Sequence, residues 1–319
     1  MRFLVTGGAG FIGSAFCRAL ASNLYSDLGL SASEITVLDS LTYAGNLNNL
    51  TELQQNPNFR FVKGSILDTK IVENLLANSD YLVNFAAESH VDNSILDGSD
   101  FVSSNVLGVV NLLETLKKFP RVRMVQVSTD EVYGSINSGS WHEESPIEPN
   151  SPYSASKASA DLFTRAYAKT HGVNVLTTRC SNNYGPHQHA EKLIPTLISK
   201  LLRDEPLPIY GDGRNIREWI HVQDHCRGIA FVVAFGQTGE VYNIGTADEF
   251  SNLEIAKMLL NLSHSNSDLN FVPDRLGHDF RYSLNTQKIR SMGWSPIVEF
   301  ESGLAETFEW YKQRANRNT

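Results

Sequence analysis

The run Thr129-Asp130-Glu131 places a hydroxyl and two carboxyl groups side by side. A tyrosine and a lysine follow it, Tyr153 and Lys157, with the spacing that puts two residues on one face of a helix. The ammonium of Lys157 would favour the phenolate of Tyr153 and make the tyrosine a usable base for a substrate hydroxyl. Oxidising an alcohol requires no carboxylate, so the adjacent acids indicate a further proton-transfer step.

The chemistry of the two acids depends on where the chain places them. Two carboxyl groups in one partly dehydrated site have their pKa values driven apart, which leaves one as an acid and the other as a base. Thr129 follows a strand predicted at residues 124–127, and doubly wound folds bind ligands at the carboxyl ends of their strands. The alternative is an acidic turn that faces water, with Tyr153 and Lys157 on an ordinary helix surface.

Apolar, β-branched segments alternate with segments of helical periodicity, which predicts a parallel sheet with helices on both faces. Strands are expected at residues 3–6, 35–38, 59–62, 81–85, 124–127 and 173–177. The helices with the clearest periodicity are expected at residues 11–23, 99–119 and 153–171. The predicted fold class is therefore α/β, with a Rossmann-type doubly wound parallel sheet.

A glycine-rich turn joins the first predicted strand to the first predicted helix. Its glycines are Gly7, Gly10 and Gly13. Such a turn lets the pyrophosphate of a dinucleotide approach the backbone and the free N–H groups of the helix N-terminus. Asp39 ends the second strand, where a carboxylate accepts hydrogen bonds from a ribose and repels a 2′-phosphate, and it is followed by Ser40 rather than arginine. The expected cofactor is therefore NAD rather than NADP.

After about residue 179 the pattern changes to loops and a second set of helices, expected at residues 193–202, 222–235, 253–262 and 303–314. We interpret this part as a smaller α/β lobe for the substrate. A strand expected at residues 241–244 would return to the first sheet. The predicted division is an NAD-binding Rossmann domain at residues 1–178 with a returning segment at about 216–246, and a substrate-binding lobe made of residues 179–215 and 247–319.

Composition argues against several classes of protein. The chain of 319 residues carries 27 basic and 35 acidic side chains, a formal charge of −8, so a general affinity for nucleic acid is not expected. Its cysteines, Cys17, Cys180 and Cys226, match neither a disulfide framework nor a metal-ligand spacing, and we assign no metal ligand. No apolar stretch is long enough to span a membrane and the amino terminus is interrupted by glycines, so we expect a soluble, cytoplasmic protein.

With these motifs the chain resembles the extended short-chain dehydrogenase/reductase family, and within it the dTDP-glucose 4,6-dehydratases. The resemblance extends nearly from end to end. The segments that carry it are residues 7–13, 39–46, 86–92, 128–134, 153–157, 182–186, 191–195 and 210–217. The Thr-Asp-Glu run distinguishes these dehydratases from the related epimerases and decarboxylases.

The resemblance implies an NAD-dependent hydro-lyase that acts on dTDP-glucose. Tyr153 would take the proton of the 4-hydroxyl while hydride passes from C4 to NAD, assisted by Thr129 and Lys157. Glu131 would then remove the C5 proton, and a protonated Asp130 would supply a proton to the departing C6 hydroxyl. Return of the hydride to C6 would give dTDP-4-keto-6-deoxy-glucose for deoxysugar biosynthesis.

The resemblance also implies which residues bind the two ligands. Those expected at NAD are Gly7, Gly10, Phe11, Ile12, Gly13, Asp39, Ser40, Thr42, Gly45, Ser65, Ile66, Ala86, Ala87, Tyr153 and Lys157. Those expected at the sugar nucleotide are Ser89, His90, Asn182, Glu191, Lys192, Leu193, Pro208, Tyr210, Arg217, Asn252, Arg275, His278 and Tyr282. The cationic members of the second set would face the diphosphate, because clustered cations in an acidic protein favour an anionic ligand.

The chain departs from the family pattern at Ser65, where an aspartate commonly contacts the adenine amine, so we expect a weaker contact there. Glu218 and Asn93 also differ from the common residues, with no consequence that the sequence reveals. Two other functions stay open: a UDP-sugar epimerase or decarboxylase, which would not need the two carboxylates, and an NAD-binding sensor without catalytic activity.

The same resemblance implies an oligomeric state. Related enzymes pair through a four-helix bundle. By analogy, the helices predicted at residues 99–119 and 153–171 would join two subunits into a homodimer.

Overall fold

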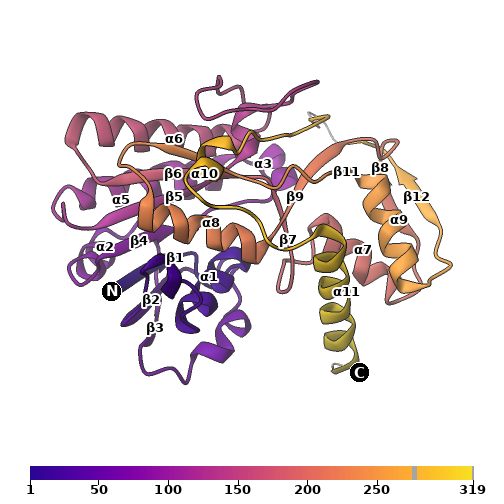
Figure 1. Cartoon of the computed structure of the whole chain (residues 1–319), viewed down its shortest axis with the longest axis horizontal. Coiled ribbons are helices and arrows are strands. Elements are labelled where there is room, and N and C mark those ends of the chain that lie inside the picture. The colour runs from indigo at the N-terminus through magenta and orange to yellow at the C-terminus, as the bar shows by residue number, and fades with distance from the viewer. Residues whose placement is uncertain (275–278, 318–319) are drawn as a thin grey trace.

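The computed structural model describes residues 1–274 and 279–317. Its largest element is a seven-stranded sheet in which all neighbouring strands are parallel, in the order β10-β6-β5-β4-β1-β2-β3 (Figure 1). The strands are β1 (Arg2–Thr6), β2 (Glu34–Asp39), β3 (Phe59–Lys63), β4 (Tyr81–Asn84), β5 (Arg123–Thr129), β6 (Val175–Cys180) and β10 (Val241–Ile244). The predicted strands are therefore confirmed, with β6 beginning and ending later than expected.

Helices cover both faces of this sheet (Figure 1). On one face, α1 (Phe11–Ala21) and α8 (Val222–Phe235) share an apolar core with the strands. On the other, α2 (Thr69–Leu76), α5 (Gly108–Leu116) and α6 (Pro152–His171) share a second core. A sheet buried on both faces explains why its strands are nearly continuous apolar runs rather than alternating ones. The predicted α/β, doubly wound fold class is confirmed.

Strand β1 lies where the order of the strands reverses, with β2 on one side and β4 on the other. Connections on the two sides of such a point leave in opposite directions, which opens a crevice beyond the carboxyl ends of the strands. The glycine turn follows β1, and Thr129 is the last residue of β5. The fold thus brings both predicted motifs to one edge of the sheet.

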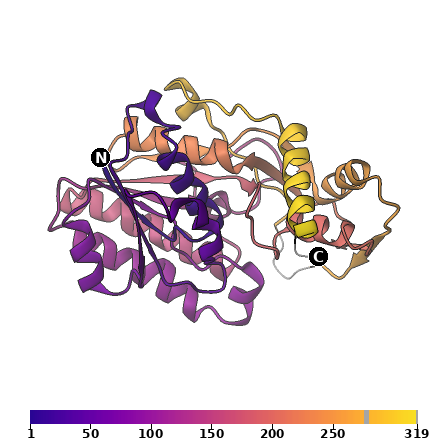
Figure 2. The ribbon, with the colours of Figure 1, turned by 90° about the horizontal axis from the view of Figure 1, so that it is seen from below.

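A smaller group of elements lies beside this edge and encloses a core of its own (Figures 1 and 2). Its strands are β7 (Asn182–Tyr184), β8 (Leu207–Tyr210), β9 (Ile216–His221), β11 (Glu249–Ser251) and β12 (Leu269–Val272), and its helices are α7 (Leu193–Leu201), α9 (Asn252–Ser263) and α11 (Phe300–Arg317). Within the segment expected to return to the large sheet, β9 instead pairs with β7 and β11, whereas β10 joins the sheet. The division into two domains stays our prediction.

The single helix expected at residues 99–119 is wrong. The segment consists of a short helix α4 (Ser99–Phe101), a π-helical turn η3 (Val102–Leu107) and α5. In this wider turn the side chain of Asn105 is buried. Its amide oxygen accepts a hydrogen bond from the Glu88 N–H (2.9 Å). Its amide nitrogen donates to the Glu88 carbonyl (2.9 Å) and to Ser156 Oγ (2.8 Å). Interrupted helical turns of this kind are frequent near functional sites, and helical periodicity does not reveal them.

The N-terminus of α6 is fixed by local signals, and this determines where Tyr153 lies. Ser151 Oγ accepts a hydrogen bond from the backbone N–H of Ser154 (3.1 Å), and Pro152 begins the helix. The helix ends at Gly172, whose φ of 65° is a left-handed conformation that glycine adopts without strain.

Several features are missing from residues 1–274 and 279–317. No helix there combines the length and low charge that crossing a membrane requires. No group of three or more histidine, cysteine or acidic side chains there is arranged to hold a metal. The cysteines Cys17, Cys180 and Cys226 are buried and unpaired.

Candidate active site

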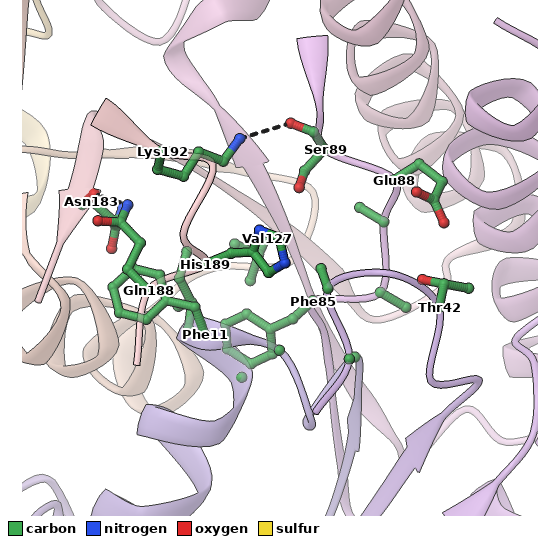
Figure 3. Close-up of a pocket in the computed structure, with 18 of the residues that line it drawn as sticks. Phe11, Thr42, Phe85, Glu88, Ser89, Val127, Asn183, Gln188, His189 and Lys192 are labelled. Carbon is green, nitrogen blue, oxygen red and sulfur yellow. Dashed lines mark hydrogen bonds between the residues drawn. The ribbon is translucent and has the colours of Figure 1, made fainter. Parts of the chain in front are cut away.

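A cavity of about 530 Å³ opens at the carboxyl edge of the large sheet and extends toward the smaller group of elements. Its walls come from the turn after β1, the ends of β4, β5 and β6, the start of α6, the segment 187–192 and α11. Figure 3 shows part of this lining, with Lys192 reaching from one wall to the carbonyl of Ser89 on another (3.0 Å). All the residues predicted to bind the cofactor line this cavity.

The glycine turn packs so closely against the backbone around it that no side chain could replace Gly7 or Gly13. Gly7 has a φ of +69°, and a Cβ built on it would lie 2.5 Å from the Ala86 nitrogen. A Cβ on Gly13 would lie 2.4 Å from the Gly7 carbonyl oxygen. Gly10 precedes α1 without any side-chain cap, so the first N–H groups of the helix keep their capacity to bind an anion.

Asp39 holds the shape of this turn in addition to facing the cavity. Its Oδ2 accepts a hydrogen bond from the Ala9 N–H (2.9 Å) and its Oδ1 accepts one from the Leu41 N–H (2.8 Å). Each carboxylate oxygen keeps a further lone pair, so the side chain can still accept from a ribose hydroxyl. Burial raises the pKa of Asp39, and the two backbone N–H groups counteract this effect.

All five residues predicted to be catalytic line the same cavity. Thr129 Oγ1 donates to Asp130 Oδ1 (3.1 Å) and accepts from the Glu131 N–H (3.3 Å). Ser154 Oγ donates to Glu131 Oε2 (3.1 Å), and Lys157 Nζ donates to the Val127 carbonyl (2.7 Å). The end of β5 and the start of α6 therefore assemble the predicted group.

The neighbours of the two acids make them chemically unequal. Burial, followed by the negative charges of Glu131 and Glu218, raises the pKa of Asp130 well above its ordinary value. Burial also raises the pKa of Glu131, but there the positive charges of Lys192 and Arg217 oppose it directly after burial in size, whereas at Asp130 the charge of Arg217 is the smallest of the causes. Asp130 therefore holds its proton more strongly than Glu131, which is the order that an acid and base pair requires.

The expectation that Lys157 lowers the pKa of Tyr153 is wrong for the chain by itself. Burial, followed by the negative charges of Glu131, Cys180 and Asp130, raises the pKa of Tyr153 well above its ordinary value. Lys157 is 5% exposed, its ammonium is bound to a carbonyl, and burial lowers its own pKa. In the chain by itself, the phenolate of Tyr153 is therefore disfavoured.

The residues predicted to bind substrate divide into groups. Ser89, Asn182, Glu191 and Lys192 line the cavity. His90 lies next to it, with its Nε2 3.4 Å from Glu191 Oε2.

Others of this set are not among the residues that line the cavity: Leu193, Pro208, Tyr210, Arg217, Asn252 and Tyr282. Arg217 packs 4.5 Å above the ring of Tyr282, and its guanidinium donates to the carbonyls of Ile216, Phe280 and Asp279. Arg275 and His278 lie outside the described residues.

The sequence analysis missed several residues at this site. Ser128, Cys180 and Ser181 line the cavity and could have been found by the rule that identified Thr129, since they flank the ends of neighbouring strands. Three residues of α11 also line it, Trp310, Tyr311 and Arg314, and no sequence signal marks them.

Glu218, for which the sequence reveals no consequence, is fully buried, and its negative charge raises the pKa of Asp130. Its carboxylate accepts hydrogen bonds from the N–H groups of Thr246 (2.8 Å), Ala247 (3.1 Å) and Leu284 (2.8 Å). Burial raises the pKa of Glu218, and these three N–H groups oppose that effect by stabilising the charged carboxylate.

We predict that Asp130 stays protonated at neutral pH, because burial and two neighbouring carboxylates raise its pKa. The infrared spectrum of the parent protein at pH 7 should contain a protonated-carboxyl band that Asp130→Asn removes. In Glu131→Gln the band should titrate at lower pH, because a neighbouring negative charge is gone. Asp212→Asn, at a carboxylate 66% exposed, is the control and should remove no such band. A parent spectrum with Asp130 ionised at pH 7 would contradict the assignment.

Comparisons with known proteins agree with this geometry. The family model described as GDP-mannose 4,6 dehydratase matches residues 4–307. A dTDP-glucose 4,6-dehydratase from Streptomyces niveus is 50% identical over 314 residues, which cover 98% of this chain and 93% of the relative.

Solved structures give the same picture. The dTDP-glucose 4,6-dehydratase DesIV from Streptomyces venezuelae, crystallised with NAD bound, superposes with a TM-score of 0.96 at 53% identity, covering 99% of this chain and 98% of that one. A UDP-glucuronic acid 4-epimerase from Bacillus cereus superposes with a TM-score of 0.92 at 30% identity, covering 98% and 100% of the two chains. From its motifs, its fold and these matches, the chain belongs to the GDP-mannose 4,6 dehydratase family, among the nucleotide-sugar dehydratases and epimerases of the extended short-chain dehydrogenases/reductases.

Proposed function

We propose that the protein is an NAD-dependent dTDP-glucose 4,6-dehydratase, a hydro-lyase that produces dTDP-4-keto-6-deoxy-glucose for deoxysugar biosynthesis. The observation that carries the proposal is the pair of unequal acids, Asp130 and Glu131, in one cavity with Thr129, Tyr153 and Lys157. Relatives that share about half of the sequence over its whole length carry the same name.

The cofactor would be held by the glycine turn, Asp39 and the residues that follow β4. The backbone N–H groups at the start of α1 would meet its diphosphate, and Asp39 would accept from a ribose hydroxyl. Ser65 would face the adenine; its Oγ already accepts from the Leu67 N–H (3.2 Å), which agrees with a weak contact. When bound, NAD supplies a reversible hydride acceptor and, in its oxidised form, the positive charge that Tyr153 lacks.

The side chains of this protein would move protons at three atoms of the sugar. Tyr153 Oη accepts the proton of the 4-hydroxyl, and Thr129 Oγ1 orients the same oxygen. A ketone at C4 acidifies the neighbouring C5 hydrogen, which Glu131 removes. Asp130, whose surroundings favour its protonated form, donates to the C6 hydroxyl as it leaves, so that water is lost across C5 and C6. When hydride adds to C6 of the resulting double bond, Glu131 returns its proton to C5.

The sugar nucleotide would lie between the catalytic group and the smaller lobe. Lys192 and Arg217 both exert a positive charge on Glu131, so an anionic diphosphate is favoured on that side of the site. Ser89, Asn182 and Glu191 would contact the same ligand as polar lining residues. The two acids set this proposal apart from a 4-epimerase, which needs the hydroxyl, tyrosine and lysine but eliminates no water.

We predict that Asp130→Asn and Glu131→Gln each slow the loss of water by at least ~100-fold, the range for removing a general acid or base. Oxidation at C4 should persist, because Thr129, Tyr153 and Lys157 are all retained and an asparagine at 130 keeps the Oδ1 acceptor for Thr129. Reduced cofactor and 4-keto-6-deoxy product are followed separately in single turnovers with dTDP-glucose and UDP-glucose. The control is Glu144→Gln, at a carboxylate that is 75% exposed. Two variants that dehydrate at the parent rate would exclude the assigned roles.

We also propose that the protein works in the cytoplasm as a homodimer joined through a four-helix bundle. Support for the bundle comes from large apolar side chains that lie exposed on η3 and α6: Val102 is 51% exposed, Leu107 54%, Leu162 55% and Phe163 40%. An apolar surface of this kind favours burial against a partner. The unpaired cysteines suit a reducing compartment.

We predict that Leu162→Glu converts the protein to monomers, because it would bury a charge in the apolar contact between subunits. Leu262→Glu, on α9 and 37% exposed, is the matched control and should leave the oligomeric state unchanged. Sedimentation velocity measures both. A parent protein that sediments as a monomer, or a Leu162→Glu variant that remains dimeric, would exclude this interface.

A further inference from the structure

Helix α11 contributes to the cavity although neither the sequence motifs nor the proposed reaction assign it a role. Trp310, Tyr311 and Arg314 of this helix are lining residues. Trp310 and Arg314 are four residues apart and share one helix face, with the guanidinium 5.2 Å from the centre of the indole ring. Helix α11 lies beside β7 and α7, at the junction of the sheet and the smaller lobe (Figure 1).

A chain of side-chain contacts connects this helix face to the glycine turn. The rings of Trp310 and His187 lie 4.6 Å apart between centres. His187 Nδ1 lies 3.1 Å from Asn49 Oδ1, and Asn49 Nδ2 donates to the Ala9 carbonyl within the turn (3.0 Å). His187 is held with a φ of +70°, a conformation that costs energy for a residue other than glycine and persists only where its contacts impose it.

Residues 187–192, which we call the strap, follow from His187 and border the cavity along their whole length. Tyr311 donates its hydroxyl to the Gln188 carbonyl, and Gln188 Nε2 donates to the Asn183 carbonyl (2.7 Å). At the other end, Lys192 Nζ donates to the Ser89 carbonyl (3.0 Å) (Figure 3). The strap is therefore fixed to α11 at one end and to the segment after β4 at the other.

The charge near this junction is positive. Burial, followed by the positive charges of Arg18 and Arg314, lowers the pKa of His187 to about 4, so the imidazole is neutral at pH 7. Within residues 1–274 and 279–317, no carboxylate forms an ion pair with Arg314. Arg18 is bound to the Asn49 carbonyl (2.7 Å) and is not among the residues that line the cavity, whereas Arg314 is.

We propose that Arg314 binds the diphosphate of the dinucleotide and that Trp310 and Tyr311 hold the strap across the cavity, so that α11 retains the cofactor. The inference rests on the use of NAD in the proposed function. A reaction that begins and ends with the same oxidation state of the cofactor has no step that requires its release. Slow release keeps the reduced cofactor in place until its hydride returns to the sugar. The strap and α11 would hold NAD in the cavity, although neither belongs to the Rossmann sheet.

The experiment measures release of NAD from the loaded protein. Protein carrying radiolabelled NAD is mixed with excess ADP-ribose, and retained label is counted after rapid filtration. Arg314→Met should release NAD about tenfold faster than the parent, the factor for losing one charge-assisted contact, and Arg314→Lys should fall between them. Lys312→Met is the matched control: Lys312 lies on the same helix, also above an aromatic ring, and pairs with Glu309 away from the cavity. It should release NAD at the parent rate.

Trp310→Ala tests the strap separately and should also accelerate release, while Trp310→Phe, which keeps a ring against His187, should restore much of the retention. Affinity for thymidine diphosphate should stay at the parent value in Arg314→Met. Parental NAD release from Arg314→Met would overturn the inference, and so would equally accelerated release from Lys312→Met. A parent protein that binds NAD tightly but does not convert dTDP-glucose would refute the proposed function and leave this inference standing.

Discussion

The exclusion of water from the carboxyl end of β5 is the constraint on which the rest of the site depends. Asp130 is 2% exposed, and one of its carboxyl oxygens has no hydrogen-bond partner among the described residues. In water, two neighbouring aspartate and glutamate side chains would ionise together. Here burial makes a second negative charge costly, so the neighbours of each acid decide which one keeps a proton.

The difference between the pKa values of Asp130 and Glu131 depends on residues from both sheets and from the strap. The sheet supplies Thr129 and the buried end of β5, whereas Glu218 and Arg217 come from β9, which belongs to the smaller three-stranded sheet. Lys192 arrives from the strap. Residues of the three-stranded sheet and of the strap therefore adjust the pKa values of groups that the large sheet presents. This arrangement explains why a common Rossmann scaffold can perform elimination in addition to oxidation.

The features that could be predicted from the sequence are those controlled by local geometry. The glycines at 7, 10 and 13 indicate a tight turn. The end of a strand predicts the position of Thr129, and one face of a helix predicts those of Tyr153 and Lys157. All of these residues line the cavity. The π-helical turn at Val102–Leu107 depends on the tertiary contacts of Asn105, which periodicity does not record. The pKa of Tyr153 depends on burial and on acids from another element. The contribution of α11 depends on packing between residues that are far apart in the chain, so no motif could have marked it.

The central claim is that one cavity oxidises C4, eliminates water across C5 and C6, and reduces C6 with the same hydrogen. The most direct measurement uses dTDP-glucose deuterated at C4 and locates the label in the product by mass spectrometry and NMR. We predict deuterium at C6 of dTDP-4-keto-6-deoxy-glucose. When labelled and unlabelled dTDP-glucose react together, the deuterium should stay in the product molecules formed from labelled substrate. Deuterium that remains at C4, as an epimerase would leave it, or that is lost from the sugar altogether, would contradict the account.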